Sequence, residues 1–211
     1  MTPPKIISFD AEGTLVTPGF SEAVWHKAIP ELYGRKNGLE FEQARQFVRQ
    51  EYDRLGDHRL EWYDISYWLN LWDLGDHRNL MHSYRDHIIY YPETKGILSK
   101  LSPNHTLIVS SASTRVFLDM MTEDIGKHFA TVFSSISDYK QVKNADFYRT
   151  VCRVMNVEPQ DIAHVGDSWD FDFIAPAEIG VRSYFLDRDG KRQGSRVVSN
   201  LQEFLDKVFE E

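Results

Sequence analysis

The stretch that decides the fold is KIISFDAEGTL, which spans residues 5–15. Its opening residues, up to Phe9, are mostly apolar, and a short apolar run of this kind is typical of a strand buried in a parallel sheet. The run ends on the carboxylate of Asp10. Because an aspartate at a strand end can simply cap a turn, its meaning depends on what the rest of the chain brings beside it.

Similar apolar runs recur along the chain, at residues 106–110, 131–134 (the weakest), 162–167 and 181–186. Helical patterns separate them, and residues 144–155 and 201–208 carry their apolar side chains on one face. Strands that alternate with helices predict an α/β fold with a Rossmann-like, doubly wound parallel sheet. Ligands of such sheets bind beyond the carboxyl ends of the strands. Asp10, Ser110 and Asp167 all stand at predicted strand ends.

Residues 17–89 break this alternation. Helical patterns cover residues 21–33, 41–55, 61–74 and 78–88, with no convincing strand between them. We therefore expect a core domain of residues 1–16 and 90–211, and an inserted helical domain of residues 17–89. The helix at 61–74 is apolar almost all round, which favours a position inside a helical bundle. The alternative is a partly exposed aromatic wall over a substrate.

Composition limits the classes of function. The chain has 211 residues and a net charge of −8, which argues against a nucleic-acid partner because phosphate backbones need a positive surface. No apolar stretch approaches the roughly 18 residues of a membrane helix, so we expect no membrane partner. A single cysteine, Cys152, excludes an internal disulfide, and with no visible signal peptide it favours a cytoplasmic location. The sequence does not predict the oligomeric state.

Acidic, hydroxyl and ammonium groups are predicted to gather at one edge of the sheet. Carboxylates at the positions of Asp10 and Asp167 would raise each other's pKa unless a cation lay between them. Oxygen ligands at this density suit Mg²⁺, which would spread the charge of a phosphoryl transition state. Lys143 could balance the remaining negative charge, and Ser110 with the following backbone amides could hold phosphoryl oxygens.

Four segments in this order resemble the motifs of the haloacid dehalogenase (HAD) superfamily. Residues 10–15, DAEGTL, resemble its first motif, and residues 107–111, LIVSS, look like its second. Residues 143–148, KNADFY, are similar to the third but lack the usual proline after the lysine, and GDSWDFD at residues 166–172 closely matches the fourth. The resemblance covers the whole chain. It implies that the helical insertion is a cap of the C1 type.

The resemblance also implies roles for individual residues. Asp10 would attack phosphorus and ligate Mg²⁺, and the backbone carbonyl of Glu12 and the carboxylate of Asp167 would complete the protein ligands. The implied substrate is a small-molecule phosphomonoester, hydrolysed through an aspartyl phosphate. Ser110, Ser111 and Lys143 would bind the phosphoryl group. Asp172 would orient Lys143 or a metal-bound water. Lys140 is the alternative candidate for the role of Lys143.

Glu12 departs from the family pattern, because phosphatases of the family carry aspartate there as the general acid and base. The backbone carbonyl is unchanged, but the carboxyl group sits one methylene further out, and a misplacement of about 1 Å can cost roughly 100-fold in rate. Either Glu12 acts as acid and base with adjusted geometry, or its side chain is inert or used otherwise, which leaves a slow enzyme or a different reaction.

Two other functions remain as alternatives. In a 2-haloacid dehalogenase the aspartate attacks carbon without a metal, and Ser-Asn typically stands where this chain has Gly166-Asp167. Asp167 therefore favours the phosphatase. A catalytically weak HAD-like binding protein is supported only by Glu12, and it is opposed by the presence of Asp10, Ser110, Lys143 and Asp167.

Overall fold

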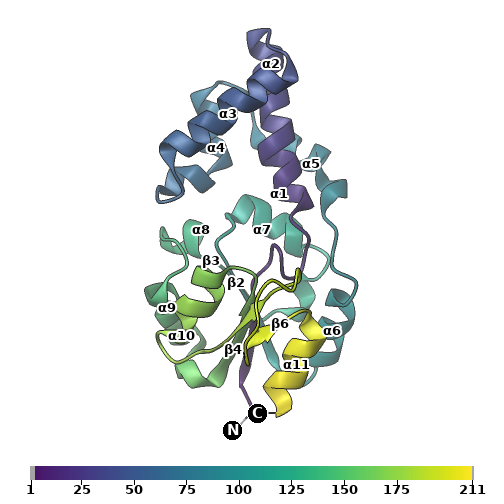
Figure 1. Ribbon diagram of the computed structural model, residues 1–211, viewed down its shortest axis with the longest axis vertical. Coiled ribbons are helices and arrows are strands. Elements are labelled where there is room, and N and C mark those ends of the chain that lie inside the picture. The colour runs from purple at the N-terminus through teal and green to yellow at the C-terminus, as the bar shows by residue number, and fades with distance from the viewer. Residues whose placement is uncertain (1–2, 211) are drawn as a thin grey trace. The chain divides into compact units, whose positions relative to one another are not determined.

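The computed structural model describes residues 3–210 and divides into two compact units (Figure 1). Met1–Thr17 with Tyr90–Glu211 form the first, here called the sheet unit, and Pro18–Ile89 form the second, the helical unit. The boundaries expected from the sequence, after residues 16 and 89, differ from these by at most one residue, while the expected ends at 1 and 211 lie outside the described residues.

The sheet unit contains six parallel strands in the order β3-β2-β1-β4-β5-β6. Their bounds are β1 Ile6–Phe9, β2 Thr106–Ser111, β3 Thr131–Ser134, β4 Ile162–Gly166, β5 Arg182–Leu186 and β6 Val197–Val198. The predicted parallel α/β fold is confirmed. Strand β6 was missed because two residues are too few to form a pattern. The strand order reverses beside β1, and a switch of this kind opens a crevice at the carboxyl ends of the two central strands.

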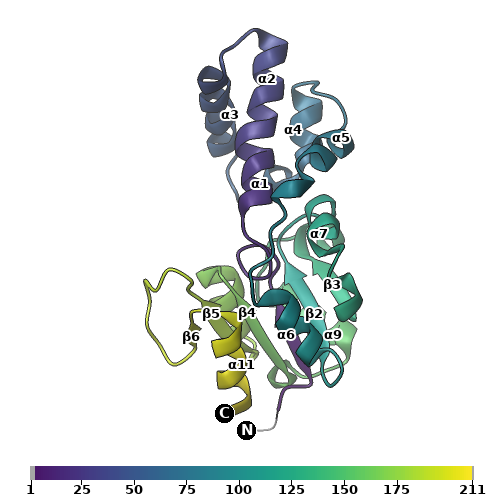
Figure 2. The ribbon, with the colours of Figure 1, turned by 90° about the vertical axis from the view of Figure 1, so that its right-hand side faces the viewer.

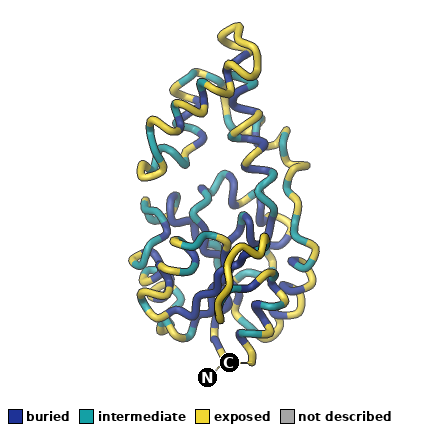
Figure 3. Tube along the Cα trace, viewed as in Figure 1, coloured by how far each residue is buried: buried dark blue, intermediate teal, exposed yellow. Residues whose placement is uncertain are grey.

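Helices cover both faces of this sheet (Figure 1). Alternate residues of a strand point to opposite faces, so Ile6 packs in one cluster with Phe147 and Val151 of α9, while Phe9 packs edge-on against Phe204 of α11, with ring centres 6.1 Å apart. The strands are the most buried part of the unit (Figure 3). Its α-helices are α6 Thr94–Leu101, α7 Arg115–Thr122, α8 Ser135–Tyr139, α9 Ala145–Met155, α10 Ala175–Ala177 and α11 Leu201–Glu210. It also contains the short 3-10 helices η4 Gly126–His128 and η5 Pro159–Asp161 and the π-helix η6 Trp169–Ile174.

Residues 18–89 form only helices, with α2 and α3 side by side (Figure 2). The elements are α1 Gly19–Ala23, η1 Val24–Ala28, α2 Ile29–Asn37, α3 Phe41–Leu55, η2 Leu60–Tyr63, α4 Ile65–Leu71, α5 His77–Ser83 and η3 Arg85–His87. The expected continuous helix at 61–74 is wrong. Asp64 interrupts it, because its carboxylate accepts a hydrogen bond from the Ser66 amide at 2.9 Å and caps the start of α4.

An aromatic cluster forms the centre of the helical unit. Trp68 is 1% exposed, its ring centre lies 4.7 Å from that of Tyr52, and its indole nitrogen donates to the Trp62 carbonyl at 3.1 Å. On the same short helix Leu71 is 50% exposed. Only one side of α4 therefore packs in the core. The segment at residues 61–74 was expected to be buried on nearly all sides, and this is correct for one side of α4 alone.

Within residues 3–210, no helix combines the length and the apolar character that crossing a bilayer requires. The cytoplasmic location stays a prediction.

Replacing Trp68 by alanine is expected to lower the free energy of unfolding of the helical unit by about 3–5 kcal/mol, the usual cost of emptying a buried tryptophan site. Leu71→Ala on the same helix removes an exposed side chain and should change it by less than about 0.5 kcal/mol. Urea unfolding followed by circular dichroism measures both. Equal effects of the two variants would contradict the described core.

Candidate active site

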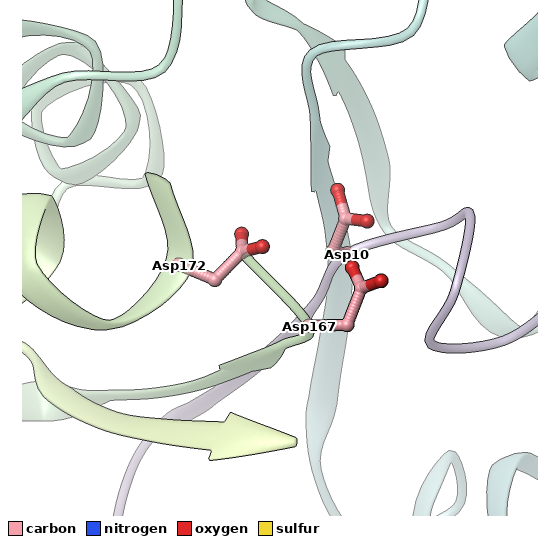
Figure 4. Close-up of side chains that lie close together, drawn as sticks. All are labelled: Asp10, Asp167 and Asp172. Atoms are coloured by element: carbon pink, nitrogen blue, oxygen red, sulfur yellow. The ribbon is translucent and has the colours of Figure 1, made fainter. Parts of the chain in front are cut away.

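Three carboxylates meet at the carboxyl edge of the sheet (Figure 4). Asp10 follows β1 and Asp167 follows β4, and these strands are hydrogen-bonded neighbours. The amide of Asp10 continues the ladder by donating to the Val165 carbonyl at 2.9 Å. Asp172 returns to the same place from η6, and the three residues offer oxygen atoms that all lie within 4.8 Å of one another.

Two glycines allow the loops to approach this closely. Gly13 has a φ of +73°, a left-handed backbone conformation that residues other than glycine rarely adopt. A Cβ atom at Gly13 would overlap the Asp167 carboxylate, and one at Gly166 would overlap that of Asp172. Glycine at these two positions is therefore a condition for gathering the three acids.

Lys143 is the buried cation of the site. Its ammonium donates to Asp10 Oδ1 at 2.8 Å and also to Asp172 Oδ1, and the residue is 2% exposed. Asn144, the next residue, caps α9 by accepting a hydrogen bond from the Phe147 amide at 2.9 Å, which fixes the backbone beside Lys143. Lys140, the alternative lysine, is exposed. Lys143 is thus the lysine that contacts the acids.

The ionisation of the acids reflects this shared site. Burial raises the pKa of Asp10 to about 6, although Lys143 acts against it. Partial removal from water, and then the charges of Asp10 and Asp172, raise the pKa of Asp167 to about 7. Burial would also raise the pKa of Asp172, but Lys143 and His164 outweigh it and hold that pKa well below its usual range. One ammonium therefore faces three carboxylates.

This surplus of negative charge makes the cluster suitable for a divalent cation. All of the available donors are carboxylate or carbonyl oxygens, which are the ligands that Mg²⁺ prefers. A cation bound between the two carboxylates would offset the charge of Asp10, which helps to raise the pKa of Asp167. The donor set thus fits a hard divalent metal ion.

The two serines that were expected to bind phosphate lie in different surroundings. Ser110 is fully buried, with its hydroxyl 3.0 Å from that of Ser8. The Ser111 hydroxyl interacts with the Asp10 carboxylate and accepts a hydrogen bond from the Ser113 amide at 3.2 Å. Glu12 lies in the loop after β1, which the Gly13 amide closes by donating to the Val16 carbonyl at 2.8 Å. Of the two serines, Ser111 is the one beside Asp10.

Three buried polar residues near the acids were missed from the sequence: Ser8, Tyr148 and His164. His164 Nε2 lies 3.0 Å from Asp172 Oδ1 and also 3.0 Å from the Tyr148 hydroxyl. His164 Nδ1 lies 2.8 Å from the Ser8 hydroxyl. The signal in the sequence was a polar residue inside an apolar strand, at Ser8 in β1 and at His164 in β4, since a buried polar group needs a partner.

Comparison with known families identifies this arrangement. The haloacid dehalogenase-like hydrolases match residues 4–180 of the chain. The chain belongs to this family. Among solved structures, a HAD phosphatase from Thermococcus onnurineus has the same fold as this HAD-like hydrolase, with a TM-score of 0.82, 22% identity and 96% of each chain covered. The HAD-hydrolase YfnB from Bacillus subtilis, whose structure was determined with magnesium bound, has a TM-score of 0.69 at 16% identity and covers 99% of this chain and 100% of its own.

A sequence relative covers a smaller part of the HAD-like hydrolase. The GMP/IMP nucleotidase YrfG of Escherichia coli strain K12 is 37% identical over 62 residues, which are 29% of this chain and 28% of that protein's own length.

Mg²⁺ is expected to raise the melting temperature more at pH 8 than at pH 6. The raised pKa values of Asp10 and Asp167, about 6 and about 7, mean that protons occupy part of the site at pH 6 and compete with the metal. The folded metal-free protein also binds more protons than the unfolded chain between their usual pKa and these raised values. Its stability therefore falls as the pH rises through that window, and bound metal offsets the loss.

Thermal unfolding with and without MgCl₂ at the two pH values measures this effect. In Asp167→Asn the stabilisation should be lost, whereas Asp170→Asn, an exposed neighbour outside the cluster, should retain it. A magnesium effect of the same size in Asp167→Asn would contradict the site.

Proposed function

We propose that this HAD-like hydrolase is a Mg²⁺-dependent phosphatase that hydrolyses small-molecule phosphomonoesters through an aspartyl phosphate on Asp10. The observation that carries the proposal is the position of Asp10, held by Lys143 at 2.8 Å and within ligand-sharing distance of Asp167. A metal-independent attack on carbon would have no use for Asp167 as a second, partly ionised carboxylate. The family supports a hydrolase, and the donor set supports one that depends on a metal ion.

Mg²⁺ held by the carboxylates of Asp10 and Asp167 and by the Glu12 carbonyl would offset the charge of the phosphoryl group, so that two anions can approach. Asp10 attacks phosphorus, and the bond between phosphorus and the ester oxygen breaks. Glu12 gives a proton to the leaving alkoxide and then takes one from the water that attacks the aspartyl phosphate, which releases inorganic phosphate and restores the Asp10 carboxylate.

Other side chains hold the reacting groups in place. Lys143 balances the charge on the phosphoryl oxygens, and Asp172 keeps its ammonium directed towards Asp10. Ser111, beside Asp10, binds a phosphoryl oxygen through its hydroxyl. Ser110 is the less suitable of the two serines because its hydroxyl lies against Ser8, whereas that of Ser111 contacts Asp10.

We further propose that the helical unit is the cap expected from the sequence, which selects the substrate and excludes water during phosphoryl transfer. Its insertion between β1 and β2 supports this role, as does the interdomain movement named for YfnB.

Purine nucleoside monophosphates are the first substrate class to test, because one relative is named a GMP/IMP nucleotidase. The helical unit contains a groove of about 740 Å³ whose lining includes Trp25, Trp62 and Arg49. Both tryptophans are partly exposed. An indole face can stack on a purine ring for about 1–3 kcal/mol, and an arginine can add a cation–π contact. We propose that this groove binds the base.

Asp10→Asn is expected to abolish hydrolysis of p-nitrophenyl phosphate, because an amide cannot form the acyl phosphate. Removing Mg²⁺ with EDTA should have the same effect, reversed by adding the metal back. Asp170→Asn is the control and should remain active. Magnesium-independent turnover, or chloride release from a 2-haloacid in place of phosphate release, would overturn the proposal.

Glu12→Gln separates the two possible roles of Glu12. If Glu12 is the general acid and base, this variant should lose about 100-fold or more in kcat, within the usual range for removing such a group, while Glu12→Asp should stay active. Steady-state kinetics on one phosphate ester measures both variants. An unchanged kcat in Glu12→Gln would show that the side chain takes no part in proton transfer.

Trp62→Ala is expected to raise the KM for GMP by about 5- to 100-fold, the loss of one stacking contact. The KM for glycerol phosphate, which has no ring, should not change. Trp72→Ala removes a tryptophan of the same unit that does not line the groove and serves as the control. Parallel changes for both substrates would exclude the groove as the base site.

A further inference from the structure

A chain of buried polar side chains runs behind the candidate active site. The hydroxyls of Ser110 and Ser8 lie 3.0 Å apart, Ser8 Oγ lies 2.8 Å from His164 Nδ1, and His164 Nε2 lies 3.0 Å from Asp172 Oδ1. The same carboxylate oxygen accepts from the Lys143 ammonium. These residues come from β2, β1, β4, η6 and the segment just before α9, and none of them is more than 2% exposed.

We propose that His164 is a positioning residue, which holds the Asp172 carboxylate and through it directs the Lys143 ammonium towards Asp10. This proposal rests on the phosphatase function proposed above. His164 lies too deep to touch a substrate, since it is fully buried beneath the carboxylates. It therefore acts only through Asp172.

The direction of each hydrogen bond follows from what the groups can donate. An ionised Asp172 is only an acceptor, so His164 Nε2 must carry the proton of that bond. In a neutral imidazole, Nδ1 is then an acceptor, and the Ser8 hydroxyl donates to it. Burial lowers the pKa of His164, although Asp172 acts against this, which agrees with a neutral ring.

Tyr148 lies beside the imidazole of His164 but does not take over its hydrogen bond to Asp172. Its hydroxyl donates to the Phe171 carbonyl at 2.9 Å and lies 3.4 Å from Asp172 Oδ1, further than His164 does. The other carboxylate oxygen, Asp172 Oδ2, accepts from the Ser168 amide at 3.0 Å. Asp172 is therefore held from opposite ends, by the loop after β4 and by His164. Losing the imidazole would remove the closer of the two ring-bearing neighbours of Asp172 Oδ1, the oxygen that also accepts from Lys143.

The arrangement predicts an effect on rate more than on binding. A hydrogen bond to a charged group that is lost in the transition state corresponds to about 10- to 100-fold in rate. His164→Phe keeps a ring and removes both nitrogens, so its kcat should fall by about that factor, with a much smaller change in KM. His164→Gln can present an amide N–H where Nε2 stood, and it should recover most of the lost kcat.

Val151→Ala is the matched stability control. Val151 is buried in the cluster on the same face of the sheet and belongs to α9, but it has no place in the polar chain. This variant should melt at a lower temperature with kcat unchanged. A merely structural role of His164 would instead give kcat losses that follow stability in all three variants, with no recovery by glutamine, and that result would overturn the proposal.

A spectroscopic test does not depend on turnover. Nitrogen-15 NMR of the labelled histidine rings should show His164 as a neutral imidazole with the proton on Nε2 at pH 7. An imidazolium, or a ring with the proton on Nδ1, would overturn the proposed chain. If the wild-type protein hydrolyses no phosphate ester, the phosphatase proposal fails, and the protonation state measured in the same sample still decides whether the chain is correct.

Discussion

The ion pair network of Lys143 with Asp10 and Asp172 is the interaction on which the rest of the site depends. All three residues are less than 8% exposed, and burying ionised groups is costly unless each charge has a partner. The network draws together the end of β1, the segment just before α9 and the π-helix η6. If the ammonium were removed, two adjacent carboxylates would face each other in a place almost closed to water. One of them would then take up a proton or the loops would separate.

Lys143 does not neutralise the whole cluster, and this imbalance is what makes the edge of the sheet suitable for chemistry. Asp167 stands beside the pair with a raised pKa of about 7, so the site holds more negative charge than its lysine can balance. A chain with a net charge of −8 would repel a phosphate ester at this point. A divalent cation would neutralise the surplus of three carboxylates over one ammonium, so that a phosphate ester could approach Asp10.

Most of the fold could be predicted from the sequence, because five strands are apolar runs and the two central ones are followed directly by Asp10 and Asp167. The sequence was less informative where a single residue determines the end of a helix or the make-up of the site. Asp64 lies inside an apolar pattern, and only its capping bond to Ser66 shows that the helix is broken there. Ser110 and Ser111 are adjacent in a strand, so they point to opposite sides, and no pattern indicates which one faces Asp10. His164 was missed because its partners come from three other segments of the chain.

In the proposed mechanism, the Asp10 carboxylate becomes phosphorylated during turnover. The most direct measurement is to quench the enzyme in acid within one turnover with a phosphate ester and Mg²⁺, reduce it with borohydride, and map the peptides by mass spectrometry. An acyl phosphate on aspartate is reduced to homoserine, and the account predicts homoserine at position 10 only when both Mg²⁺ and substrate are present. Reduction at another aspartate, or at none while phosphate is being released, would contradict it.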